Sequence, residues 1–200
     1  MQDFMKIILS RHGEPFEFSN DPISADCFSD WIDQYNSAPI NKNSNPYEQD
    51  LAILSECNLC VSSDLRRSKD SVVRLGLNRV VEENALFREA GLPYSHLKTF
   101  KLSPKIWAAI FRVIWYLGYS EGSESKATVK ARAEKATNEL VRLAEQYDVI
   151  VLVGHGIFNR FLATRLLRKG FHGPKSPSSR YWGANVYERE KHNKKQQRTD

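Results

Sequence analysis

The chain has 200 residues, of which 41% are hydrophobic and 11% aromatic. This length and apolar share fit one globular domain with its own core and exclude a disordered chain. The net charge of +5 is concentrated in residues 189–200, which contain five Lys or Arg and two Asp or Glu. A basic, hydrophilic terminus is typical of a solvated tail, so we expect no nucleic-acid partner. We predict a single domain over residues 1–188, followed by a flexible basic tail.

The three cysteines are too few for a disulfide framework. Cys57 and Cys60 have the CxxC spacing, but no second pair is present to complete a zinc site. They precede a predicted strand rather than open a helix, so we predict that they pack in the core. No signal peptide is visible, and no apolar run is long enough to span a membrane. These features favour a cytoplasmic protein without membrane contact.

The first predicted element is a buried strand over residues 4–10, which ends at Arg11-His12-Gly13. Residues 24–36 have apolar side chains at the spacing of one helix face, so they predict a helix. Residues 37–50 are rich in Asn, Pro and Ser, which indicates a surface loop. Together these segments predict an inserted helix and loop over about residues 14–58.

Strands then alternate with helices to the end of the domain. The strands are predicted at residues 59–63, 79–83, 148–156 and 184–189, and the helices at 65–77, 104–118, 125–146 and 157–170. This alternation predicts an α/β fold of the Rossmann-like type, with a mostly parallel central sheet and helices on both faces. Ligands of such sheets bind outside the carboxyl ends of the strands.

Polar residues follow three of these strands, and we expect them to meet in one pocket. They are Arg11 and His12, one of Arg66 or Arg67, and His155. Clustered cations repel one another, and a phosphoryl dianion between them would relieve that repulsion. Arginine donates two parallel hydrogen bonds to phosphate oxygens. Gly13 and Gly156 each follow a histidine, where they would let the backbone approach the ligand and offer N–H groups to it.

A histidine among arginines favours its neutral form, because neighbouring positive charge opposes protonation. A neutral imidazole is a nucleophile when a hydrogen bond holds one ring nitrogen and leaves the other facing phosphorus. Phosphoryl transfer then requires the protein mainly to position groups and neutralise charge. The predicted pocket meets this requirement without a metal or another cofactor.

The ordered motifs resemble those of the histidine phosphatase superfamily, the phosphoglycerate-mutase-like proteins. The chain has "LSRHGE", "CVSSDLRRSKDS" and "VLVGHGIFNRFLA" in the family's order, and the resemblance spans about residues 5–168. It implies that His12 is the phosphorylated nucleophile and that Arg11 and His155 bind the phosphoryl group. It also selects Arg67 as the pocket arginine, with Arg66 pointing elsewhere.

The family's proton donor is a carboxylate between the second and third motifs. Glu89 in "ALFREAGLP" is our choice, with Glu82 and Glu83 as competitors at a strand end. The segment lacks the family's Arg-x-Tyr-Gly stretch, which disfavours a mutase. Asn20 is a weak candidate for the family's pocket-closing asparagine.

We therefore predict a metal-independent phosphatase that acts through a phosphohistidine on a phosphorylated small molecule or phosphoprotein. One alternative is a phosphate- or phosphoprotein-binding module without efficient catalysis. Less favoured alternatives are a phosphoglycerate-type mutase and a nucleic-acid-binding protein that acts through the basic tail.

Overall fold

The computed structural model describes residues 4–17, 19–76 and 80–191. Five strands form one sheet in the order β3-β2-β4-β1-β5. They are β1 (Phe4–Arg11), β2 (Leu59–Ser62), β3 (Val80–Glu83), β4 (Val149–Gly154) and β5 (Ala184–Glu190). The first four strands run parallel, and β5 pairs antiparallel with β1 at the edge. The predicted mostly parallel α/β sheet is confirmed.

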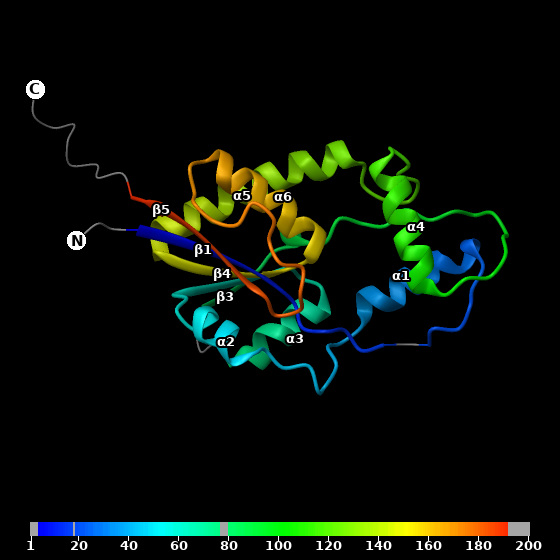
Figure 1. Ribbon diagram of the computed structural model, residues 1–200, viewed down its shortest axis with the longest axis horizontal. Helices are drawn as coiled ribbons and strands as arrows, with labels where there is room; N and C mark the ends of the chain where they lie inside the picture. The colour runs from blue at the N-terminus through cyan, green and yellow to red at the C-terminus, as the bar shows by residue number, and fades with distance from the viewer. Residues whose placement is uncertain (1–3, 18, 77–79, 192–200) are drawn as a thin grey trace, which may run out of the picture.

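The helices cover both faces of the sheet and one of its ends. They are α1 (Phe28–Ser37), α2 (Glu48–Leu54), α3 (Arg66–Leu75), α4 (Pro104–Tyr116), α5 (Lys126–Tyr147) and α6 (Gly156–Arg168). In Figure 1, α5 and α6 lie on one side of the sheet and α2 and α3 on the other, while α1 and α4 lie beyond one end. Two short 3-10 helices are Ala25–Cys27 and Ala85–Phe87.

Alternating side chains of the strands build a core on each face of the sheet. In β1, Ile7 and Leu9 pack in the core that includes α5 and α6 residues, whereas Ile8 packs in the core on the α3 face. Each of the three is 0% exposed, because a strand between two helical layers is covered on both sides. Cys57 and Cys60 are buried in the core on the α3 face, and burial raises the pKa of Cys60 to about 12. The predicted packing role of these two cysteines is confirmed.

Two sequence expectations differ from the structure. Residues 48–54 form helix α2, although the loop was predicted to extend to residue 50. The domain also continues beyond residue 188, because β5 includes Arg189, whose backbone pairs with Met5. The predicted tail therefore starts two residues too early, and residues 192–200 lie outside the described part of the chain. Within the described ranges, no helix is both long and apolar enough to cross a membrane.

Candidate active site

The sheet register brings three strand ends together. Arg11 at the end of β1 is paired with Gly154 at the end of β4. One step earlier, Val153 is paired with both Ser10 in β1 and Ser62 in β2. Because these strands are parallel neighbours, the residues that follow them lie at one edge of the sheet. The structure thus places the three predicted motifs side by side.

His12 is 2% exposed and is held by hydrogen bonds on both sides of its ring. Its Nδ1 lies 2.7 Å from the carbonyl oxygen of Gly13, which can only accept, so the ring proton is on Nδ1. Its Nε2 keeps a lone pair and accepts from Arg67 Nε at 3.2 Å. Burial and the nearby Arg67 guanidinium hold the pKa of His12 well below its usual range. The imidazole is therefore neutral, and Nε2 is the ring nitrogen that keeps a lone pair.

Arg67 is 1% exposed and lies in the first turn of α3. The helix dipole opposes a cation there, and burial adds a desolvation cost, so neither helix stability nor packing explains its position. Its Nη1 donates to Tyr35 O at 3.2 Å and to Asn36 Oδ1 at 3.3 Å. These contacts join the end of α1 to the cluster and aim the guanidinium at His12.

His155 is 0% exposed and precedes the first residue of α6. Its ring centre lies 5.0 Å from that of His12. Ser63 Oγ lies 2.7 Å from its Nε2, and Ser68 Oγ lies 3.3 Å away. Ser63 Oγ also donates to Ser68 Oγ at 3.0 Å. When either hydroxyl donates to Nε2, the ring proton is on Nδ1, where it can donate to an anion. Burial and the neighbouring His12 and Arg67 hold the pKa of His155 well below its usual range.

Arg11 completes the cationic cluster from the end of β1. Its guanidinium carbon lies 3.9 Å from the ring centre of Tyr181, and its Nη1 donates to Ser179 O at 2.6 Å. Arg11 Nε and His155 Nδ1 are buried polar atoms that have no hydrogen-bond partner among the residues the structure describes. Such atoms are costly unless a ligand satisfies them, and both can donate to phosphate oxygens. Their chemistry fits the predicted phosphoryl group.

The two predicted glycines lie at the cluster but have different surroundings. The N–H of Gly13 donates to Ser71 Oγ at 2.8 Å, and a Cβ at this position would overlap the Trp182 ring. Gly13 thus allows close packing, and its N–H serves Ser71 rather than a ligand. A Cβ at Gly156 would lie 3.5 Å from Arg11 Nε, which is ordinary van der Waals contact.

Glu89 binds the start of α6 with both carboxylate oxygens. Its Oε1 accepts from the N–H of Phe158 at 2.8 Å, and its Oε2 accepts from that of Ile157 at 3.1 Å. The carboxylate thus caps the helix that follows His155. Glu82 and Glu83 were the other candidates for the proton donor. Glu83 pairs with Lys69 at 3.6 Å, and the charge of Glu82 helps to raise the pKa of Arg142 in α5. The contacts of Glu89 therefore favour it as the carboxylate of the site.

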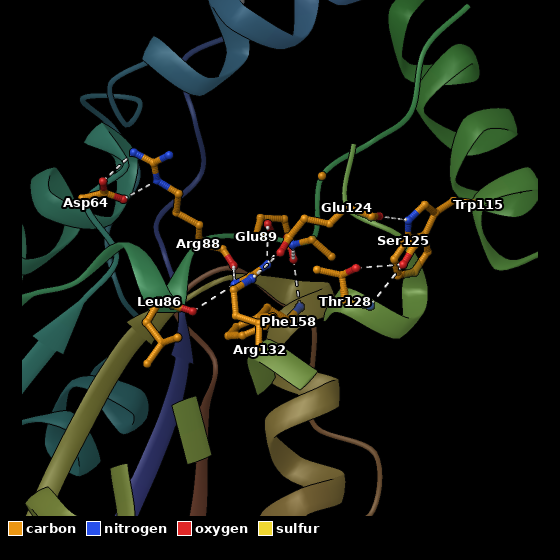
Figure 2. A network of polar contacts seen from close by, with 12 residues as sticks. Asp64, Leu86, Arg88, Glu89, Trp115, Glu124, Ser125, Thr128, Arg132 and Phe158 are labelled. Atoms are coloured by element: carbon orange, nitrogen blue, oxygen red, sulfur yellow. Dashed lines mark hydrogen bonds and ion pairs between the residues drawn. The ribbon is translucent and has the colours of Figure 1, made fainter. Parts of the chain in front are cut away.

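Arg132 of α5 holds the segment that carries Glu89, as Figure 2 shows. Its Nη1 donates to the carbonyls of Leu86 and Arg88 at 2.9 and 2.8 Å, and its Nη2 donates to that of Glu89 at 3.3 Å. Glu124 accepts from the same guanidinium at 2.9 and 2.6 Å. One partly buried arginine thereby holds three backbone carbonyls of residues 86–89 beside the site.

A cavity of about 340 Å³ lies beside the cluster. Glu89 lines it together with Tyr35, which is stacked by Arg67, and Tyr181, which is stacked by Arg11. Asn20 also lines this cavity. Arg66 lies elsewhere, because its exposed side chain pairs with Asp70 at 3.8 Å.

Sequence reasoning assigned no role to Ser63, Ser68 or Tyr181. The two serines lie within the second motif. Their position just after a predicted strand could have identified them as hydrogen-bonding residues of the site. Tyr181 lies in an irregular segment before β5, and only the folded chain brings it to Arg11.

The sequence pattern of the histidine phosphatase superfamily, branch 1, matches residues 49–199. This range exceeds half of the chain and includes Arg67, Glu89 and His155, while His12 precedes it. The chain therefore belongs to the histidine phosphatase superfamily, and the predicted enzyme class, a phosphatase, is confirmed. No curated protein matches it in sequence.

Solved structures share the fold at low sequence identity. A mycobacterial glucosyl-3-phosphoglycerate phosphatase is 22% identical with a TM-score of 0.54, covering 82% of this chain and 80% of its own. An open-reading-frame product of Mycobacterium tuberculosis is 17% identical with a TM-score of 0.59, covering 94% and 96%. YhfR of Bacillus stearothermophilus is 17% identical with a TM-score of 0.56, covering 90% and 89%.

Proposed function

We propose that this chain hydrolyses phosphate monoesters through a covalent phosphohistidine on His12. The observation that carries the proposal is the state of the His12 ring, whose Nδ1 proton is held by Gly13 while Nε2 faces Arg67. The lone pair of Nε2 attacks phosphorus as the bond from phosphorus to the leaving oxygen breaks. Arg11 and Arg67 neutralise charge on the phosphoryl oxygens, and His155 donates a hydrogen bond to them. A proton from Glu89 goes to the leaving oxygen.

Water completes the cycle. It attacks phosphorus of the phosphohistidine, the nitrogen–phosphorus bond breaks, and the proton of water returns to Glu89. No step uses a metal ion, so we expect turnover to be unchanged after treatment with a chelator. A decrease that added metal restores would contradict this part of the proposal.

The test is phosphate release from a small alkyl phosphate by the wild type and by His12→Ala. We expect His12→Ala to abolish turnover, whereas His172→Ala, which changes an exposed histidine, leaves it unchanged. Full activity of His12→Ala would overturn the proposal. Binding of inorganic phosphate without turnover by the wild type would favour the non-catalytic module, and transfer of phosphate to a second alcohol would favour a mutase.

A further inference from the structure

The cavity beside Glu89 has one aromatic wall. Trp31 and Tyr35 of α1 line it and stack on each other, with ring centres 5.1 Å apart and planes 14° apart. The stack continues through Phe28 at 5.4 Å from Trp31 and Phe111 at 5.0 Å from Phe28. In this column Phe28 and Tyr35 cover the two faces of the Trp31 ring, so the wall offers the cavity fixed ring edges, which suit edge-to-face packing of another aromatic ring.

The cations that line this cavity are already engaged. Lys105 pairs with Glu17 at 2.6 Å. Arg112 donates to the carbonyls of Ala90 at 2.8 Å and Gly91 at 3.3 Å, and lies over the Trp115 ring. Two of the hydrogen bonds that an arginine offers to an anion are thus made to backbone.

Carboxylates also line the cavity, and they repel a second anionic group on a substrate. Glu14, Glu17 and Glu89 all lie on its surface. A phosphate or carboxylate on the leaving group would meet Glu14 and would need Lys105, which Glu17 already holds. The electrostatics therefore disfavour bisphosphates and phosphorylated acids.

We propose that the preferred leaving group is an uncharged alcohol that carries an aromatic ring, packed against the edges of the Trp31 and Tyr35 rings. This inference rests on the proposed phosphatase function, because it takes the phosphoryl group to lie at His12 and the remainder of the ester to lie in the adjoining cavity. Tyr35 and Tyr181 border the cavity and also contact Arg67 and Arg11, so one substrate can reach both places.

The test compares kcat/KM for 2-phenylethyl phosphate, ethyl phosphate and 3-phosphoglycerate. All three release a primary alcohol, so their intrinsic reactivities are similar and the comparison measures recognition. Burial of a phenyl ring should raise kcat/KM for 2-phenylethyl phosphate at least about tenfold over ethyl phosphate. We expect 3-phosphoglycerate to be the poorest substrate. Equal values for the three esters, or a preference for 3-phosphoglycerate, would overturn this inference and leave the proposed function standing.

Variants test the two parts of the inference separately. Trp31→Leu keeps an apolar side chain but removes the central ring of the column, and we expect it to reduce the ratio between the ring ester and ethyl phosphate severalfold. Gln34→Ala, at an exposed position of the same helix, should leave that ratio unchanged. Glu17→Gln removes a carboxylate and releases Lys105, so kcat/KM for 3-phosphoglycerate should rise severalfold. An unchanged ratio in Trp31→Leu contradicts the aromatic wall, and no gain in Glu17→Gln contradicts the charge argument. Absence of hydrolysis of every ester by the wild type would instead contradict the proposed function itself.

Discussion

Arg67 combines three features that a structural arginine seldom has together. It is buried, it lies at a helix N-terminus, and its Nε contacts a second basic group, His12. Burial and the helix N-terminus both oppose a cation at this position, and the proposed phosphoryl group would offset that cost. Natural sequences break local rules of this kind mainly at functional sites.

Replacing Arg67 with lysine tests whether the planar fork is required. Lysine keeps the charge but cannot contact His12, Tyr35 and Asn36 in one fixed geometry. We expect kcat/KM to fall about 100-fold, which corresponds to the loss of charge-assisted hydrogen bonds. Arg66→Lys is the matched control, because the Arg66 side chain is exposed, and this variant should retain wild-type kinetics. If the two variants lowered kcat/KM equally, the assignment of Arg67, and not Arg66, to the pocket would be contradicted.

Glu89→Gln tests the proton donor. Glutamine can still accept from the N–H of Phe158, so the start of α6 should remain in place. We expect kcat for an alkyl phosphate to fall about 100-fold or more, because an alkoxide leaves poorly without a proton. For p-nitrophenyl phosphate, whose leaving group needs less protonation, the loss should be much smaller. Glu83→Gln controls for the removal of another carboxylate and should keep wild-type kcat. If Glu89→Gln lost activity equally on the alkyl ester and on p-nitrophenyl phosphate, proton donation by Glu89 would be excluded.

The residues of the candidate site were predictable where a motif and a strand end coincide. His12, Arg67 and His155 each follow a strand closely, so the topology of a parallel sheet was enough to bring them together. The hydrogen-bond partners were not predictable in this way. Tyr35 reaches Arg67 through its backbone carbonyl, and a carbonyl carries no sequence signal.

At the scale of elements, Arg132 ties the segment of residues 86–89 to α5. Arg132→Lys removes the fork that reaches three carbonyls and Glu124 at once. We expect the free energy of unfolding in urea to fall by about 1–3 kcal/mol. Arg142→Lys on the same helix alters an exposed pair with Glu139, and it should change stability by less than about 0.5 kcal/mol. An Arg132→Lys variant as stable as the wild type would show that the segment holds its shape without this contact.

The elements themselves were largely predictable because their patterns are local. Strand β4 has an uninterrupted apolar run, and α5 repeats Ala and Leu at helical spacing. Helix α2 was missed because it is only seven residues long and follows a run of Asn, Pro and Ser. Its burial of Leu54 against the sheet stabilises it, and that contact appears only in the folded chain.

Over the whole molecule, two neutral histidines are buried in one cluster, and this predicts sensitivity to acid. Their pKa values are lower in the folded chain than in the unfolded chain, chiefly because burial opposes the charged form. The unfolded chain therefore binds more protons below about pH 6.5, and acid favours it. The stabilisation is fully present above that pH and is lost as the pH falls.

The measurement is the free energy of unfolding in urea between pH 7.5 and 5. We expect it to fall by up to about 1.4 kcal/mol per pH unit for each histidine below about pH 6.5. His155→Gln should flatten this dependence, whereas His96→Gln, at an exposed position, should not. A pH dependence that His155→Gln leaves unchanged would contradict the neutral, buried state of that ring.

The cavity is the feature of the whole molecule that sequence patterns describe least. Its walls come from the inserted segment, the region after β3 and the irregular chain before β5. Local sequence patterns predict the helices in these regions but do not fix how the regions are placed relative to one another. The leaving-group site is therefore visible only in the folded chain.

The most direct test of the central claim is rapid acid-free quenching during turnover of a radiolabelled phosphate ester. We predict label bound covalently to residue 12 of the wild type, stable in base and lost in acid, which forms and decays fast enough to account for turnover. His12→Ala should take up none. Sustained turnover without any labelled protein, or equal labelling of His12→Ala, would contradict a phosphohistidine at this site.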